Sequence, residues 1–147
     1  MIYIGSDHAG YQLKEKLKIY VEELGYEIDD KGPFSLNDKD DYPDFVKPVT
    51  IAVASNDTNM GIIIGGSGQG EAMCANRFKG IRAAVYYGHS RKIIRITREH
   101  NNANILALGA RFLRLGCAKR AVKIFLKTPF SNDERHIRRI NKLEPSN

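Results

Sequence analysis

The segment MGIIIGGSGQGEAMCAN, residues 60–76, joins a short apolar run to a glycine-rich loop and the start of a helix. Ile62, Ile63 and Ile64 are consecutive and β-branched, which predicts a strand buried on both faces. The glycines that follow let the backbone turn sharply and approach a ligand closely; they are Gly65, Gly66, Gly68 and Gly70. The segment therefore predicts a parallel sheet with a ligand site after this strand.

Glu71 follows the loop, and its charge bears on which ligand the loop can hold. A carboxylate repels phosphate, so the pattern favours an uncharged polar group at the loop, with Glu71 directed at it. The alternative is an acidic residue in a first helical turn, where the helix dipole favours it. The loop matches neither of two nucleotide-binding motifs. A P-loop needs a lysine near the position of Glu71, and the dinucleotide-binding pattern needs a third glycine that Gly70 does not supply.

The length of 147 residues is typical of one domain with a sizeable core. No apolar run is long enough to cross a membrane, and the N-terminal residues MIYIGSDHAG lack the features of a signal peptide. We therefore expect a cytoplasmic protein with no membrane partner. Cys74 and Cys117 form no metal-type pair, a disulfide is not expected, and the histidines are too scattered to suggest a metal site.

The formal net charge is +6, and basic residues crowd the C-terminal third of the chain. Nucleic acid or a small phosphorylated anion could explain this charge, whereas a solvated helix face is the better interpretation for most of these residues. Arg135 and Arg139 are four residues apart on a predicted helix that Ile137 and Ile140 would anchor. They would share one face and could clamp a phosphate.

Predicted strands alternate with predicted helices along the chain. The strands cover residues 1–5, 26–30, 62–64, 81–86 and 105–108, and the helices cover 9–24, 42–55, 90–99, 115–127 and 131–143. Gly25 predicts a helix C-cap, Pro48 is expected to kink its helix or delay its start, and Ser131 with Glu134 predicts a capping box. A tail is expected from Pro145. The alternation predicts an α/β fold, with a mainly parallel sheet covered by helices on both faces.

Polar side chains follow three of the predicted strands: Asp7 and His8 the first, Glu71 the central one, and Arg111 the last. Ligands bind beyond the carboxyl ends of parallel strands, so these residues should converge on one site. The alternative for the first pair is that Asp7 caps a helix and His8 lies on the surface. His100 ends a helix, where it could serve as an acid or as a cap.

Several motifs together resemble one family, the type B ribose-5-phosphate isomerases, which also includes the galactose-6-phosphate isomerase subunits. The matching stretches are SDHAGYQLK (6–14), DYP (41–43), GGSGQGEAMCANR (65–77), GIRAA (80–84), REHNNAN (98–104), GAR (109–111) and RHIRR (135–139). The resemblance implies a Rossmann-like three-layer sandwich with a five-stranded sheet. It also implies a homodimer with sites shared between subunits, and a reaction without a metal or organic cofactor. Whether dimers pair into tetramers is left open.

The resemblance also implies residue roles. One branch of the family carries a cysteine base where this chain has Gly65; this chain is similar to the other branch, whose glutamate base matches Glu71. His100 would open the sugar ring, and Asp7 and His8 would hold its oxygens. The enediolate end would lie on Gly66, Ser67, Gly68, Gln69 and Gly70. Asn101, Arg111, Arg135 and Arg139 would bind chiefly the phosphate, and Tyr42 would shield the site.

The implied reaction interconverts ribose 5-phosphate and ribulose 5-phosphate, a step of the pentose phosphate pathway. It needs a base that moves a proton between carbons 1 and 2 and donors around the enediolate oxygen. A phosphate held on distant arginines removes the conflict with Glu71. An isomerase of galactose or allose 6-phosphate stays open as an alternative. A nucleic-acid-binding module is disfavoured, because Asp7 and Glu71 would lie in the same groove.

Overall fold

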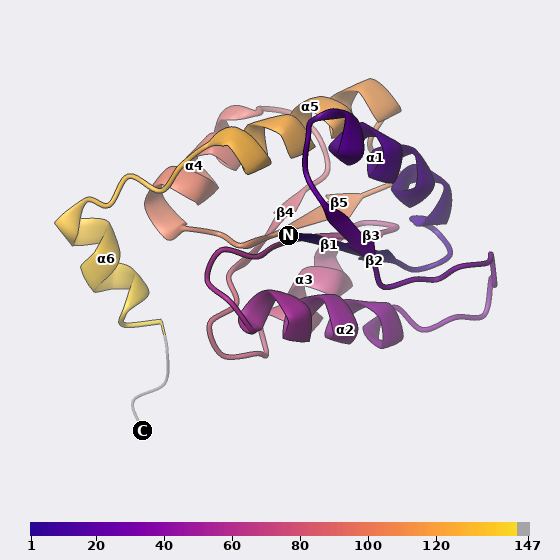
Figure 1. Ribbon diagram of the computed structural model, residues 1–147, viewed down its shortest axis with the longest axis horizontal. Coiled ribbons are helices and arrows are strands. Elements are labelled where there is room, and N and C mark those ends of the chain that lie inside the picture. The colour runs from indigo at the N-terminus through magenta and orange to yellow at the C-terminus, as the bar shows by residue number, and fades with distance from the viewer. Residues whose placement is uncertain (144–147) are drawn as a thin grey trace.

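The computed structural model describes residues 1–143 and shows a parallel sheet between two layers of helices (Figure 1). The strands are β1 (Ile2–Ser6), β2 (Ile28–Asp30), β3 (Met60–Gly65), β4 (Ala83–Tyr86) and β5 (Ile105–Gly109). They form one five-stranded sheet in the order β2-β1-β3-β5-β4, and every neighbouring pair is parallel. The predicted α/β sandwich is confirmed. The tail expected from Pro145 lies outside the described residues.

Helices cover both faces of the sheet. On one face lie α1 (Tyr11–Glu23), α4 (Lys92–Asn101) and α5 (Leu115–Lys127), and on the other α2 (Pro43–Ala54) and α3 (Gln69–Ala75) (Figure 1). The last helix, α6 (Glu134–Ile140), lies beside α4 at one end of the sandwich (Figure 1). Among the described residues, no helix combines the length and the apolar character needed to span a membrane.

The isoleucines of β3 explain why this strand is central. Ile62 and Ile64 pack in a core with side chains of α1 and α5, whereas Ile63 packs in a second core with α2 and α3. All three side chains are fully buried. The prediction of a strand buried on both faces is therefore confirmed, and each face of the sheet has its own apolar core.

Two helix boundaries test the local sequence signals. Gly25 follows α1 with a φ of +87°, as expected of a glycine that ends a helix. The delay expected from Pro48 is wrong, because α2 already begins at Pro43 and contains Pro48. Pro48 and Asp44, whose carbonyl lacks the usual helical donor, are both exposed, so water can replace that hydrogen bond.

The start of α6 differs from its prediction. The helix begins at Glu134 with Asp133 at the N-cap position and no side-chain cap, so the predicted capping box is wrong. Ser131 instead accepts a hydrogen bond on Oγ from the Asp133 N–H at 3.2 Å, which makes a local turn before the helix. Of the two predicted anchors, Ile137 is wrong because it is exposed, whereas Ile140 is half-buried; the buried side chain of this helix is His136.

The connections of β1 and β3 open a crevice at the carboxyl edge of the sheet. These two strands are neighbours, yet the helices that follow them, α1 and α3, leave to opposite faces. Such a change of direction leaves space above the strand ends. The residues directly after β1 and β3 therefore meet at the edge where a ligand can enter.

Candidate active site

A cavity of about 350 Å³ lies at the carboxyl ends of β1, β3 and β5. The three segments predicted to converge do meet there, and its lining comprises Asp7, His8, Ala9, Tyr42, Gly66, Ser67, Gly70, Glu71, Arg111 and Phe112. Backbone hydrogen bonds tie these segments together. The Asp7 N–H donates to the Ile64 carbonyl at 3.2 Å, and the Arg111 N–H donates to the Gly66 carbonyl at 3.1 Å.

Glu71 is the buried carboxylate of this cavity, and only 4% of its surface is exposed. It lies directly against Gly65: a Cβ atom on Gly65 would stand 1.7 Å from Oε1 of Glu71 and 2.1 Å from its Cδ. Burial raises the pKa of the Glu71 carboxyl; the charge of Asp7 adds to this, while the backbone N–H of Glu71 opposes it. A carboxylate with a raised pKa is suited to act as a general base.

The other glycines of the loop make room for further lining residues. A Cβ atom on Gly66 would lie 3.3 Å from the guanidinium carbon of Arg111, and one on Gly70 would lie 2.9 Å from Cζ of Tyr42. Gly68 has a φ of +78°, and a Cβ atom there would lie 3.1 Å from the backbone of β5. Arg111 and Tyr42 can thus pack closely against the loop, because glycine has no side chain to occupy that space.

Asp7 and His8 have both structural and cavity-facing roles. Oδ1 of Asp7 accepts a hydrogen bond from the Gly10 N–H at 2.9 Å, which supports the turn into α1, and Asp7 still lines the cavity. Nδ1 of His8 lies 2.6 Å from Oδ1 of Asp40. Asp40 carries no local sequence signal of this role, because it contacts His8 across 32 residues.

Two of the loop residues predicted to bind substrate, Gly68 and Gln69, do not line the Glu71 cavity. Gln69 is exposed as the first residue of α3, and its N–H donates to Oγ of Ser67 at 3.3 Å. Gly68 is buried against β5.

The remaining predicted residues lie at the other end of the sandwich. His100 and Asn101 are in the last turn of α4, which leads to the amino-terminal end of β5. Arg135 and Arg139 are in α6, beside α4 (Figure 1). All four residues are exposed, and none lines the cavity that contains Glu71. Within the described part of one chain, the predicted site residues therefore form two separate groups.

His136 supports this second group. Its ring stacks on that of His100, with the centroids 4.3 Å apart and the planes at 29°. Oγ of Ser131 lies 2.9 Å from Nδ1 of His136. Burial lowers the pKa of His136, and the nearby His100 and Arg135 lower it further. Because His136 is buried and contacts Ser131, its ring is held in place, and the exposed ring of His100 stacks on it.

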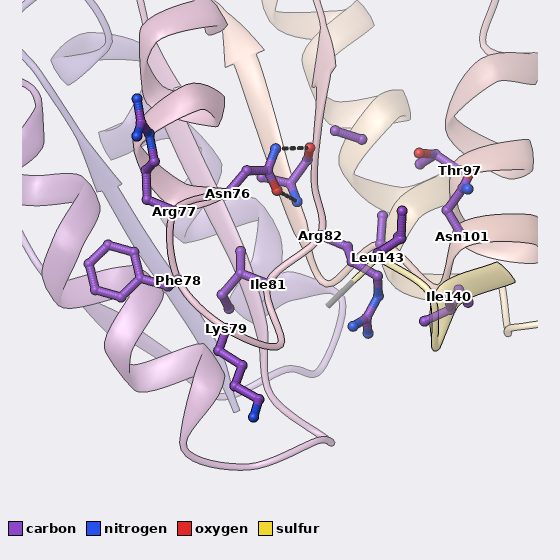
Figure 2. A pocket seen from close by; sticks show the side chains of 13 residues that line it. Asn76, Arg77, Phe78, Lys79, Ile81, Arg82, Thr97, Asn101, Ile140 and Leu143 are labelled. Atoms are coloured by element: carbon purple, nitrogen blue, oxygen red, sulfur yellow. Dashed lines mark hydrogen bonds between the residues drawn. The ribbon is translucent and has the colours of Figure 1, made fainter. Parts of the chain in front are cut away.

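Figure 2 shows a larger cavity, of about 550 Å³, at the same end as α6. Its lining comprises Asn76, Arg77, Phe78, Lys79, Ile81, Arg82, Ala83, Ala84, Thr97, Asn101, Ala103, Ile140 and Leu143. Among residues 1–143, this lining includes no carboxylate, histidine or cysteine, and of the predicted site residues it includes Asn101. We therefore assign proton-transfer chemistry to the smaller cavity, which holds Glu71.

Cys74 does not line the Glu71 cavity. It is half-buried, and burial raises the pKa of its thiol, which disfavours the reactive thiolate. The geometry therefore favours packing as its role. Over residues 1–143, no group of three or more histidine, cysteine, aspartate or glutamate side chains is arranged to hold a metal ion.

Comparisons with known proteins agree with this geometry. A family model described as Ribose/Galactose Isomerase matches residues 2–143. The ribose-5-phosphate isomerase B of Mycolicibacterium paratuberculosis is 38% identical over 142 residues, which are 97% of this chain and 88% of the relative.

Solved structures give the same result. The Mycoplasma genitalium ribose-5-phosphate isomerase B with bound ribulose-5-phosphate is 38% identical, with a TM-score of 0.92 over 97% of this chain and 92% of that one. The corresponding enzyme of Thermotoga maritima is 44% identical, with a TM-score of 0.89 over 97% of this chain and 95% of that one. The predicted family resemblance is confirmed over nearly the whole chain.

Proposed function

Because the chain belongs to the ribose/galactose isomerase family, we propose that it interconverts ribose 5-phosphate and ribulose 5-phosphate, as a single isomerase domain. Relatives at this level of identity are named ribose-5-phosphate isomerase B, and one solved neighbour holds ribulose-5-phosphate. The observation that carries the proposal is the buried carboxylate of Glu71 in a cavity that also contains Arg111.

In this reaction Glu71 takes the proton from carbon 2 of the aldose and returns it to carbon 1, through an enediolate. Its raised pKa makes it a stronger base than an exposed carboxylate, as long as it is ionised at the working pH. Ser67 and the amides of the loop around Gly66 and Gly70 supply donors for the enediolate oxygen, which preorganised groups stabilise efficiently. Asp7 and His8 hold sugar oxygens at the end of β1.

The choice of glutamate as the base follows from the contact with Gly65. Any side chain at position 65 would occupy the space of the Glu71 carboxylate, since a Cβ atom there would lie 1.7 Å from Oε1. A base on residue 65 and the observed position of Glu71 are therefore mutually exclusive. This exclusion supports Glu71 as the base, as the resemblance to the glutamate branch of the family implies.

The second group of residues completes the site from another subunit. His100, Asn101, Arg135 and Arg139 are exposed at the end of the sandwich remote from the Glu71 cavity. In a two-fold dimer, this end of one chain can cover the cavity of its partner. His100 then opens the sugar ring, Tyr42 shields the cavity, and the arginines join Arg111 in binding the phosphate.

Subunit mixing tests the shared site. Glu71→Gln and His100→Asn are each expected to be inactive alone. In a mixed dimer with shared sites, both substitutions fall in one site and the other site is intact. Random pairing makes half of the dimers mixed, so roughly a quarter of the wild-type activity should return. If each site is built from one chain, no intact site arises and mixing restores nothing.

Substrate assays test the reaction itself. Purified protein is mixed with ribose 5-phosphate while ribulose 5-phosphate is measured, and the assay is repeated with galactose 6-phosphate and allose 6-phosphate. We expect the pentose phosphate to give the highest kcat/KM. Turnover of a hexose phosphate alone would contradict the proposed substrate. Phosphorylated sugars of this kind are cytoplasmic metabolites, which agrees with the location expected from the sequence.

A further inference from the structure

The loop between β2 and α2 places a carboxylate, that of Asp40, against His8, which lines the Glu71 cavity. Oδ1 of Asp40 lies 2.6 Å from Nδ1 of His8 and also accepts a hydrogen bond from the His8 N–H at 3.1 Å. The side chain of Asp40 is 5% exposed, although its neighbours Asp38 and Lys39 are exposed. Asp40 is thus turned inward from a polar loop and is bound to His8 at two points.

The second oxygen of Asp40 favours a positively charged partner for this carboxylate. Oδ2 is buried and has no hydrogen-bond partner among the described residues. A buried carboxylate is costly unless a positive charge compensates it. The group in contact with Asp40 is the imidazole of His8, and the 2.6 Å separation is typical of a short, charge-assisted hydrogen bond.

The surroundings of His8 support its charged form. The hydrogen bond that the His8 side chain donates to Asp40 raises the pKa of His8; desolvation opposes this, and the charges of Asp7, Asp40 and Asp38 add to it. Across the cavity lie Glu71 on α3 and Arg111 after β5. The shift of the His8 pKa arises from Asp40, Asp7 and Asp38, and neither Glu71 nor Arg111 is among its causes.

The geometry of the ring leaves one nitrogen for a ligand. Nδ1 is committed to Asp40, and His8 lines the cavity. In the imidazolium form Nε2 also carries a proton, so His8 can donate a hydrogen bond and present a positive charge at the same time. Such a group is a stronger donor to a substrate oxygen than a neutral imidazole is.

We propose that Asp40 is a positioning residue that orients His8 and keeps it protonated, so that His8 holds its substrate oxygen with a charged rather than a neutral hydrogen-bond donor. The substrate part rests on the proposed function. The protonation part concerns the chain alone and can be measured without turnover.

The first test follows the titration of His8 by NMR. Asp40→Asn keeps the size of the side chain and removes its charge, Asp38→Asn is the matched control in the same loop, and His8→Gln assigns the signal. We expect the pKa of His8 to fall in Asp40→Asn and to change much less in Asp38→Asn. An unchanged pKa in Asp40→Asn overturns the proposal. If Asp40→Asn does not fold, Asp40→Ala is titrated with the same criterion.

The second test separates charge from structure through the pH dependence of KM. At a pH between the pKa of His8 in Asp40→Asn and its higher pKa in the wild type, we expect Asp40→Asn to raise KM for ribose 5-phosphate about tenfold, the loss expected for one charge-assisted hydrogen bond. The ratio of the KM of the variant to the KM of the wild type should approach one at acid pH, where His8 is protonated in both proteins. A ratio that stays constant with pH contradicts the proposal and indicates a purely structural role.

The two tests also distinguish failure of this inference from failure of the proposed function. If His8 titrates as expected but no sugar phosphate is turned over, the proposed function is wrong and the protonation role of Asp40 stands. If turnover is present and the pKa of His8 does not respond to Asp40→Asn, the role of Asp40 is wrong.

Discussion

Replacing Gly65 by alanine should disable the enzyme through a displacement of Glu71. A Cβ atom at this position would lie 1.7 Å from Oε1 and 2.1 Å from Cδ of Glu71. Non-bonded heavy atoms rest about 3.5 Å apart, so the carboxylate has to move by roughly 1.5 Å. A misplacement of about 1 Å can cost a factor of about 100 in rate. We therefore expect Gly65→Ala to lower kcat by about 100-fold or more, or ~2.7 kcal/mol of transition-state stabilisation.

The assay compares kcat and the unfolding temperature of Gly65→Ala with those of a matched control. Gly116 lies in α5, and the nearest atom to a Cβ atom there is 3.9 Å away, so Gly116→Ala should keep wild-type activity. In a protein that already carries Glu71→Gln, adding Gly65→Ala should lower kcat little further, because the base is already absent. A folded Gly65→Ala protein with activity within a few-fold of the wild type would refute the reasoning.

Further predictions concern stability, substrate affinity and metal dependence. The pKa of Glu71 is raised in the folded protein, so its contribution to stability is present at low pH and is lost as the pH rises through that pKa. Glu71→Gln should therefore raise the unfolding temperature at pH 8, where ~1 kcal/mol corresponds to about 2–4 °C, and the gain should vanish near pH 4. Arg139→Ala should raise KM at least about tenfold with little change in kcat; an unchanged KM would remove Arg139 from the phosphate site. Dialysis against a chelator should leave kcat unchanged, because side chains and amides supply the proposed chemistry; a loss that zinc or magnesium restores would contradict this.

The sequence was sufficient to predict the sheet and one half of the site. The run Ile62–Ile63–Ile64 predicts a doubly buried strand without any tertiary information, and its side chains do alternate between two cores. Parallel strands end at one edge, so Asp7, Glu71 and Arg111 could be brought together on topology alone. These predictions depend on burial and on parallel strands, which the apolar runs and the alternation of strands with helices indicate.

The errors and omissions arise where a tertiary contact decides the outcome. Ser131 has the sequence signature of a helix cap, yet it binds the Asp133 N–H and contacts His136 instead. Asp40 resembles its exposed neighbours in the sequence, and its burial against His8 depends on the path of the whole loop. The contact between Gly65 and Glu71 likewise depends on the turn of the loop, which the sequence pattern does not specify.

The central claim, that Glu71 is the base, is tested most directly by comparing Glu71→Gln with Cys74→Ser in single-turnover and binding measurements. Both side chains are on α3, and only Glu71 lines the cavity. Glu71→Gln should still bind ribose 5-phosphate while its rate of proton transfer falls by at least about a thousandfold, and Cys74→Ser should retain most of its activity. Wild-type-like turnover by Glu71→Gln, or a fatal Cys74→Ser substitution, would contradict the account.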